Sequence, residues 1–227
     1  MDLLLSHIRL KLNQDIFLKD PEQTDLGRQI ISEALIMIDE LGLETFTFRK
    51  LAKQLQTAES SIYRYFENKH KLLIYFTNYY WALLEYYMVF KTTNLISAEH
   101  KLEVAIGILC NPLQLNSEEL LLSIDRLNRI VIAESTKSFL TKEIDTENKA
   151  GFFEAYKNVT KRLVNIINEV NPDYKYAKTV SSTCVEGMLH QQYFAKHLPS
   201  LTDFNNYDDD GRAKIFYQLI IKNIKAS

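Results

Sequence analysis

The 227-residue chain is poor in the residues that form turns, with only 6 glycines and 4 prolines. This scarcity favours long helices joined by short loops over a many-stranded sheet. Apolar runs are also short, and none approaches the roughly 20 residues that a membrane-spanning helix needs. Residues 1–7 lack a basic segment and a long apolar run, so no secretory signal is predicted. We therefore expect a cytoplasmic protein with no membrane partner.

Metal-binding residue types are also scarce. The two cysteines, Cys110 and Cys184, cannot provide a disulfide framework or a four-ligand zinc site, and we interpret them as reduced core thiols. The five histidines are scattered, and only Glu186 and His190 share a helix face at an i, i+4 spacing. Two ligands without a third are a weak metal signal, and a surface pair or a polar group in a pocket is the simpler interpretation. We predict no metal and no cofactor.

The short motifs of common enzyme classes do not occur. The sequence has no His-Glu-x-x-His, no Gly-x-Ser-x-Gly, no phosphate loop and no dinucleotide fingerprint. We therefore predict no catalytic residues and do not expect an enzyme. The net charge of −2 gives no indication of nucleic-acid binding for the chain as a whole, so the local distribution of charge is the informative property.

Apolar spacing predicts four successive helices in the first third of the chain. They cover about 24–42, 48–54 and 58–66, with a longer one from Lys69 onward. Thr47 and Asn68 are the expected N-caps of the second and fourth helices, and Gly42 is the expected C-cap of the first. A long helix followed by two short ones, joined by a turn of about three residues, is the helix-turn-helix arrangement. Its second short helix would lie in the major groove of DNA.

Basic residues gather in this predicted motif. Between Thr47 and Lys71 there are six basic and two acidic residues, a net charge of +4, which leaves about −6 for the rest of the chain. A basic module on an acidic body suits a protein that meets phosphates with one end only. A solvated helical face that happens to be basic is the alternative. The helix lengths and their spacing favour DNA binding.

These residues resemble the DNA-binding domain of TetR-type (tetracycline-repressor-like) regulators over about 24–75. The similar stretches are TFRKLAKQ at 47–54, SSIYRYFENK at 60–69, and Leu72-Leu73. The most specific part is the Tyr-x-x-Phe-x-x-Lys-x-x-Leu-Leu run that begins at Tyr63. Several chemically unrelated positions agree in order and spacing, which makes the resemblance a strong one.

Three residues depart from the family pattern. Gln56 stands in the turn where the family usually has glycine, and Ala58 stands where Ser or Thr often caps the recognition helix. Thr57 is then an alternative cap. Glu59 stands where a basic or neutral residue is commoner, and its carboxylate would either repel phosphate or accept a hydrogen bond from the amino group of a cytosine.

The resemblance implies eight DNA-contacting residues: Thr47, Arg49, Ser60, Ser61, Tyr63, Arg64, Tyr65 and Lys69. Thr47 and Arg49 would contact phosphates, or a guanine in the case of Arg49. Tyr65 and Lys69 would hold phosphates, with Lys69 assisted by a helix N-terminus, and the other four would face the groove. For each residue, ordinary exposed polarity is the alternative. Ile62 and Phe66 are expected to be the apolar anchor behind the recognition helix.

Residues 76–227 carry no named motif but are predicted to be helical. The first helix continues to about 90, and the others cover about 98–110, 117–134, 151–170, 174–197 and 208–226. Asn116 followed by Glu119 resembles a capping box for the helix over 117–134. The family resemblance implies that the last two helices pair with their mates in a homodimer. Twofold symmetry would then present two recognition helices to the half-sites of a palindromic operator in double-stranded DNA.

An aromatic stretch over 79–87 suggests either a ligand cavity or ordinary core packing. Tyr80, Trp81 and Tyr87, together with His190, are the candidate pocket residues for an unknown small-molecule effector.

The sequence thus predicts an all-α protein in three parts. An N-terminal extension at 1–23, either an extra helix or an arm, precedes a three-helix, helix-turn-helix DNA-binding domain at 24–75. A C-terminal helical ligand-binding and dimerisation domain follows at 76–227. The predicted function is a transcriptional regulator, a repressor relieved by a small-molecule ligand. The alternative is a helical ligand- or protein-binding dimer with a vestigial helix-turn-helix. The departures at Gln56, Ala58 and Glu59 favour this alternative.

Overall fold

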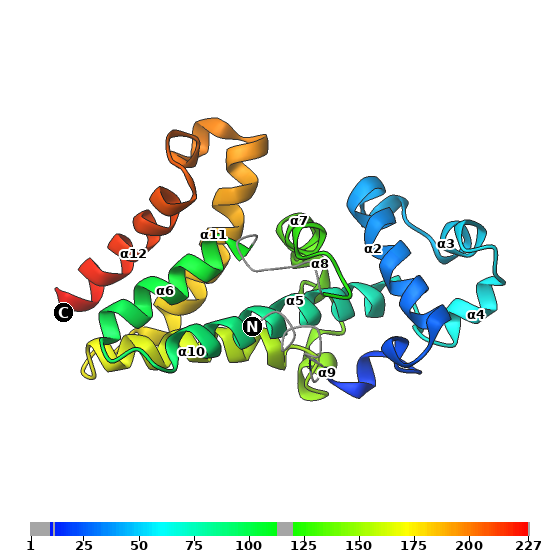
Figure 1. Ribbon diagram of the computed structural model, residues 1–227, viewed down its shortest axis with the longest axis horizontal. Helices are drawn as coiled ribbons and strands as arrows, with labels where there is room; N and C mark the ends of the chain where they lie inside the picture. Colours follow the sequence, from blue (N-terminus) through cyan, green and yellow to red (C-terminus); the bar gives the residue numbers. More distant parts are fainter. Residues whose placement is uncertain (1–9, 11, 113–119, 227) are drawn as a thin grey trace. The chain divides into compact units, whose positions relative to one another are not determined.

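The computed structural model describes residues 10, 12–112 and 120–226, and every regular element in them is a helix (Figure 1). The predicted all-α class is confirmed. The chain forms two compact units, each made of two segments. One comprises Met1–Tyr80 and Asn116–Ala155, and the other comprises Trp81–Leu115 and Tyr156–Ser227. The three short helices between residues 124 and 149 therefore share a unit with the helix-turn-helix. The predicted division at residue 75 was made by function and stays a prediction.

The first unit contains the elements nearest the predicted DNA-binding residues. These are the 3-10 helices η1 (Gln14–Ile16) and η2 (Pro21–Gln23), α2 (Asp25–Thr45), α3 (Phe48–Gln54), α4 (Glu59–Tyr63), the beginning of α5 (Lys69–Thr92), α7 (Ile124–Glu134), α8 (Thr136–Phe139) and α9 (Ile144–Lys149). Asn68 caps α5 as predicted, because its Oδ1 accepts a hydrogen bond from the backbone N–H of Lys71 at 2.9 Å.

The second unit contains the remainder of α5 and the C-terminal helices. These are α6 (Ala98–Cys110), α10 (Glu154–Val170), α11 (Ala177–His197), the 3-10 helices η4 (Pro199–Leu201) and η5 (Phe204–Asn206), and α12 (Asp209–Lys225). Helix α6 packs against both α11 and α12. The last helix begins with acidic residues: the Asp208 side chain accepts the Gly211 N–H, and Asp209 and Asp210 lie in the first turn.

Three predicted helix starts are wrong, and one of them is the start of α11, which was predicted at 174 and lies at Ala177. The helix predicted from 117 begins at Ile124, where Ser123 caps it through the N–H of Arg126; the predicted capping box at Asn116 lies outside the described residues. The helix predicted from 151 begins at Glu154, because Gly151 has φ +81°, a left-handed value that cannot continue a right-handed helix. The short helices α8 and α9 were not predicted.

Both cysteines are buried and unpaired, as predicted. Burial raises the pKa of the Cys110 thiol to about 12 and that of Cys184 to about 11. A thiol with so high a pKa is a poor nucleophile, since the thiolate is the reactive form. No helix within the described ranges combines the length and the hydropathy that a membrane crossing requires.

The described part of the N-terminal extension packs within the first unit. Its Leu18 N–H donates to the carbonyl of Tyr65 at 2.8 Å, and the amide of Asn13 donates to the carbonyl of Ala150 at 2.7 Å. At the start of α2, a Cβ on Gly27 would lie 2.2 Å from the Pro21 carbonyl oxygen. Only glycine permits that approach, so the extension is fitted closely to α2.

Candidate nucleic-acid interface

Helix α2 is the support for the motif. Thr24 caps it by accepting the N–H of Gly27 at 3.1 Å, and its inner face buries five apolar residues: Ile30, Ile31, Ala34, Leu35 and Ile38. Helical geometry breaks at Gly42, which has φ +75° and ψ 156°. This conformation is essentially restricted to glycine. The regular helix is therefore interrupted at Gly42, the predicted C-cap, and a further helical turn follows up to Thr45.

The turn between α3 and α4 contains the first departure from the family pattern. Thr47 caps α3 by accepting the N–H of Lys50 at 3.2 Å. At the other end, Thr57 N–H donates to Ala52 O at 3.0 Å, and Gln56 N–H donates to Lys53 O at 3.3 Å. These bonds make a Schellman motif, whose left-handed position is usually glycine. Gln56 occupies it with φ 52°, at a cost of roughly 1 kcal/mol relative to a right-handed residue.

Helix α4 has five residues and a bare N-terminus. Its N-cap is Ala58, which makes no side-chain cap hydrogen bond, so the suggestion that Thr57 caps the helix is wrong. Ile62 and Phe66 have no exposed surface and form the apolar anchor, as predicted. Phe48 and Leu51 of α3 are buried behind them. The outward residues of α4 are therefore presented by a rigid support.

Most of the predicted contact residues lie on the surface of this motif. Thr47, Arg49, Ser60, Tyr63 and Arg64 are exposed, and Ser61 is half-buried. Two further exposed lysines, Lys50 and Lys53, lie on α3, and the ammonium of Lys50 donates to Thr45 O at 2.8 Å. The exposed cations and hydroxyls are the groups that contact phosphates and base edges in protein–DNA complexes.

Tyr65 makes its contacts within the protein. It is 4% exposed, and its hydroxyl lies 2.7 Å from the hydroxyl oxygen of Thr24. Its backbone carbonyl accepts the Leu18 N–H. In this structure Tyr65 fastens the extension and α2 to the end of the recognition helix, and its phosphate contact stays a prediction.

Lys69 is engaged within the protein. Its ammonium donates to Leu43 O at 2.9 Å and to Glu44 O at 3.3 Å, so it satisfies carbonyls that the end of α2 leaves unpaired. In the next turn of α5, His70 and Lys71 both contact the buried carboxylate of Glu147 at 3.1 and 2.9 Å. The start of α5 is thus tied to α2 on one side and to α9 on the other.

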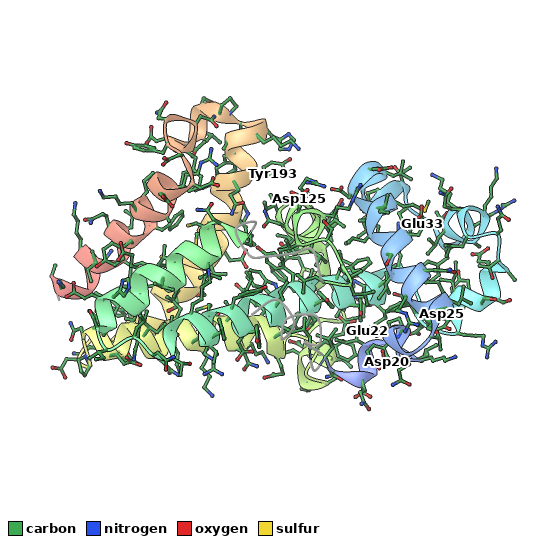
Figure 2. All side chains as sticks on the ribbon, in the orientation of Figure 1. Asp20, Glu22, Asp25, Glu33, Asp125 and Tyr193 are labelled. Carbon is green, nitrogen blue, oxygen red and sulfur yellow. The ribbon has the colours of Figure 1, made fainter. Side chains whose placement is uncertain are left out.

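Acidic residues mark the opposite end of α2. Asp20, Glu22 and Asp25 lie around its first turn (Figure 2). Arg28 pairs with Asp25 and donates to the carbonyl of Glu22. Negative charge repels phosphate, so the basic surface that suits DNA is confined to α3, α4 and their turn.

Charged side chains also join α7 and α8 to the end of α2 nearest α3. The Arg126 guanidinium donates to Asp39 at 2.7 Å, and Glu134 accepts the N–H of Leu43 at 3.1 Å. Lys137 bridges Glu134 and Glu44 at 2.7 and 3.1 Å. These contacts hold the segment that leads from α2 into α3.

The four candidate residues of the effector pocket comprise three buried aromatic residues and one exposed histidine. Tyr80 and Tyr87 are buried in packed surroundings, and the Tyr80 hydroxyl donates to Asn128 at 2.9 Å. Trp81 packs against Tyr156 with ring centroids 5.0 Å apart. His190 is exposed, and its Nδ1 lies 2.8 Å from the carbonyl of Glu186. None of these four residues lines the groove found in the second unit, so the core interpretation fits the three aromatic residues.

An open groove of about 620 Å³ lies between α11 and α12. Its lining is mostly apolar or hydroxyl-bearing and includes Thr183, Cys184, Phe204, Phe216 and Leu219. Leu219 is 55% exposed and the neighbouring Tyr207 is 49% exposed. This groove was not predicted, because it depends on how two helices pair. In the described part of the chain, no three His, Cys, Asp or Glu side chains are grouped so as to hold a metal.

The geometry of α2, α3 and α4 defines the first unit as carrying a helix-turn-helix DNA-binding domain. The sequence profile of "Bacterial regulatory proteins, tetR family" matches residues 30–76. The helix-turn-helix segment is therefore similar to the tetR family over these residues, as the resemblance indicated.

Solved structures share the fold over most of the chain. FadR from Bacillus subtilis in complex with stearoyl-CoA is 20% identical with a TM-score of 0.61, and the match covers 85% of this chain and 96% of that one. AibR in complex with isovaleryl coenzyme A and operator DNA is 15% identical with a TM-score of 0.59, covering 85% and 97%. A tetR-family regulatory protein from Rhodococcus RHA1 is 14% identical with a TM-score of 0.62, covering 86% and 95%. No curated protein matches the sequence.

Proposed function

We propose that the protein is a transcriptional repressor that binds a palindromic operator as a homodimer. The observation that carries this proposal is the exposed basic face of α3 and α4 on a buried apolar support. Arg49, Ser60, Ser61, Tyr63 and Arg64 supply the contacts to bases and phosphates, together with Thr47 at the start of α3.

The dimer forms through α11 and α12. The open groove between these helices and the exposed Tyr207 and Leu219 beside it supply an apolar face of the kind found at subunit interfaces. A twofold axis would set the two recognition helices at half-sites about one DNA turn apart, or a multiple of it. The experiment is sedimentation at micromolar concentration, in which a monomer would contradict the dimer.

The effector is an acyl thioester of coenzyme A. Support comes from two proteins of similar fold, one solved with stearoyl-CoA and one with isovaleryl coenzyme A. Binding would shift the start of α5, which Lys69 ties to α2 and which His70 and Lys71 tie to α9. A displaced α2 would change the separation of the two recognition helices and release the operator.

The proposal is tested by selecting bound sequences from a random duplex library at two salt concentrations. A palindromic consensus with affinity that falls steeply with salt supports it, because neutralised phosphates release counterions. Arg64→Ala should weaken binding, whereas Lys175→Ala, an exposed lysine in the second unit, should not. Stearoyl-CoA and isovaleryl-CoA are then added to the complex, with free coenzyme A as the control, to measure release.

The second candidate is a helical ligand- or protein-binding dimer whose helix-turn-helix no longer binds DNA. The strained Gln56 and the uncapped Ala58 favour it, because both weaken the placement of α4. Failure to enrich any sequence at low salt, with and without the coenzyme A thioesters, would favour this candidate over a DNA-binding regulator.

A further inference from the structure

The recognition helix carries one carboxylate, and a neighbouring tyrosine orients it. Ile62 is the single buried residue of α4. Tyr63 donates from its hydroxyl to Glu59 Oε1 at 3.4 Å, an i, i+4 pair on one face of the helix. Glu59 and Tyr63 therefore project from the same side of a helix whose opposite side is anchored.

The tyrosine is itself held from behind. Its ring meets the ring of Phe48 edge to face, with centroids 5.1 Å apart. Phe48 is 5% exposed and belongs to the buried side of α3. The position of the Glu59 carboxylate is thus set by a chain of contacts that runs from the core of the motif through Tyr63.

No cation of the protein accounts for this carboxylate. Within the described residues, no lysine, arginine or histidine lies within 4.0 Å of Glu59. The exposed charges of the surrounding face are positive, from Arg49, Lys53 and Arg64. A carboxylate accepts hydrogen bonds and donates none, and it is repelled by phosphates. The partner that suits it in a DNA groove is an exocyclic amino group on a base edge.

We propose that Glu59 determines specificity by accepting a hydrogen bond from the N4 amino group of a cytosine in the major groove. Tyr63 is its positioning residue. Cytosine is the base that presents a donor without a neighbouring N7 acceptor, and acidic side chains are its usual readers. This inference rests on the proposed DNA-binding function and extends it to one base pair in each half-site.

The experiment repeats the library selection with Glu59→Gln and Glu59→Ala. The unaltered protein should require cytosine at one position in each half-site. Glu59→Gln should change the preference there to adenine, because an amide pairs with adenine N6 and N7. Glu59→Ala should lose base preference at that position only. Replacing the cytosine by thymine should then lower the affinity of this variant by less than about 3-fold, whereas the same replacement should lower the affinity of the unaltered protein by on the order of 10-fold.

Tyr63→Phe is the matched variant for the positioning role. It keeps the ring that packs on Phe48 and removes the hydroxyl that holds the carboxylate. Preference should weaken at the same cytosine position that Glu59→Ala changes. A residue that only stabilised α4 would lower affinity for every sequence by one factor, so the position of the change is the deciding readout.

Three results would overturn the inference. The first is that Glu59→Ala selects the unaltered consensus. The second is that it binds all sequences more tightly by one factor, as expected if the carboxylate only repelled phosphate. The third is that the altered position carries a base other than cytosine. In each case the unaltered protein still yields a consensus, and the proposed function stands. If it yields none, the DNA-binding function fails and the inference falls with it.

Discussion

Arg129 of α7 binds the carboxylate of Asp39 on α2 through two parallel hydrogen bonds. Its Nε donates to Oδ1 and its Nη2 donates to Oδ2, each at 2.8 Å. Arg129 also pairs with Asp125 on its own helix. A guanidinium fork on a carboxylate is the strongest geometry for such a pair, and here it fixes α7 to the helix that supports the motif. The hydrogen bond from Arg129 holds the pKa of Asp39 below its ordinary value of 3.8, against the opposing effect of burial.

Replacing Asp39 by asparagine should lower the free energy of unfolding by about 1–2 kcal/mol at pH 7. This value is modest because solvent around Arg129 screens the ion pair. A carboxyl whose pKa is lower when folded stabilises the protein above its unfolded value of 3.8. The stabilisation is lost as the pH falls through the lower, folded value. The difference between the two proteins should therefore shrink below about pH 4 in urea titrations. Asp173→Asn, on an exposed loop, is the control and should show no such difference.

Tyr65→Phe separates a fastening role from a phosphate contact. Removing the hydroxyl deletes the bond to Thr24 and should cost about 1 kcal/mol of stability. The affinity of the folded protein for its operator and the salt dependence of that affinity should not change. Binding isotherms at several salt concentrations check this, and a slope lower by about 1 would restore Tyr65 to the phosphate contacts.

Lys69→Met and Arg64→Ala should act on different properties. The methionine keeps the apolar stem of Lys69 but removes the donors to Leu43 O and Glu44 O, and it should cost about 1–2 kcal/mol of stability. Arg64 is exposed, so Arg64→Ala should leave stability unchanged and lower the salt slope of DNA binding by about 1. Denaturant titration and binding on the same preparations distinguish them. Equal stability loss in both variants would contradict the assignment.

Ala58→Ser should stabilise the motif. The residue has the extended backbone of an N-cap but supplies no oxygen to α4, and a serine hydroxyl there is worth about 1 kcal/mol. Ala58→Val is the control, since its side chain has no oxygen. Hydrogen exchange of the α4 amides is the measurement. Protection that rises in both variants would mean that capping is not the cause.

Local features of the fold were predictable from the sequence. Helix α3 begins and ends at the predicted residues because Thr47 is a strong cap and its hydrogen bond stays within one turn. Helix α6, over Ala98–Cys110, also has its predicted bounds. The start of α7 was missed because Ser123 and Asn116 are both good caps, and nothing in a single sequence ranks them.

Long-range contacts limited the prediction of the site. The exposed residues of α3 and α4 follow from helical periodicity, so Arg49 and Arg64 were placed correctly on the surface. The burial of Tyr65 was not predicted, because it depends on Thr24, 41 positions away in the sequence. The groove between α11 and α12 arises from tertiary pairing, and no local pattern encodes it.

The close fit of the N-terminal extension limits how the motif can be transplanted. Leu18 and the Pro21 carbonyl contact Tyr65 and Gly27, two residues that a minimal helix-turn-helix would retain. A chimaera that joins residues 24–75 to a foreign body would leave Tyr65 and the start of α2 uncovered. The part of this protein that can be fused to another domain therefore begins upstream of α2, and fusion designs should include residues 12–23.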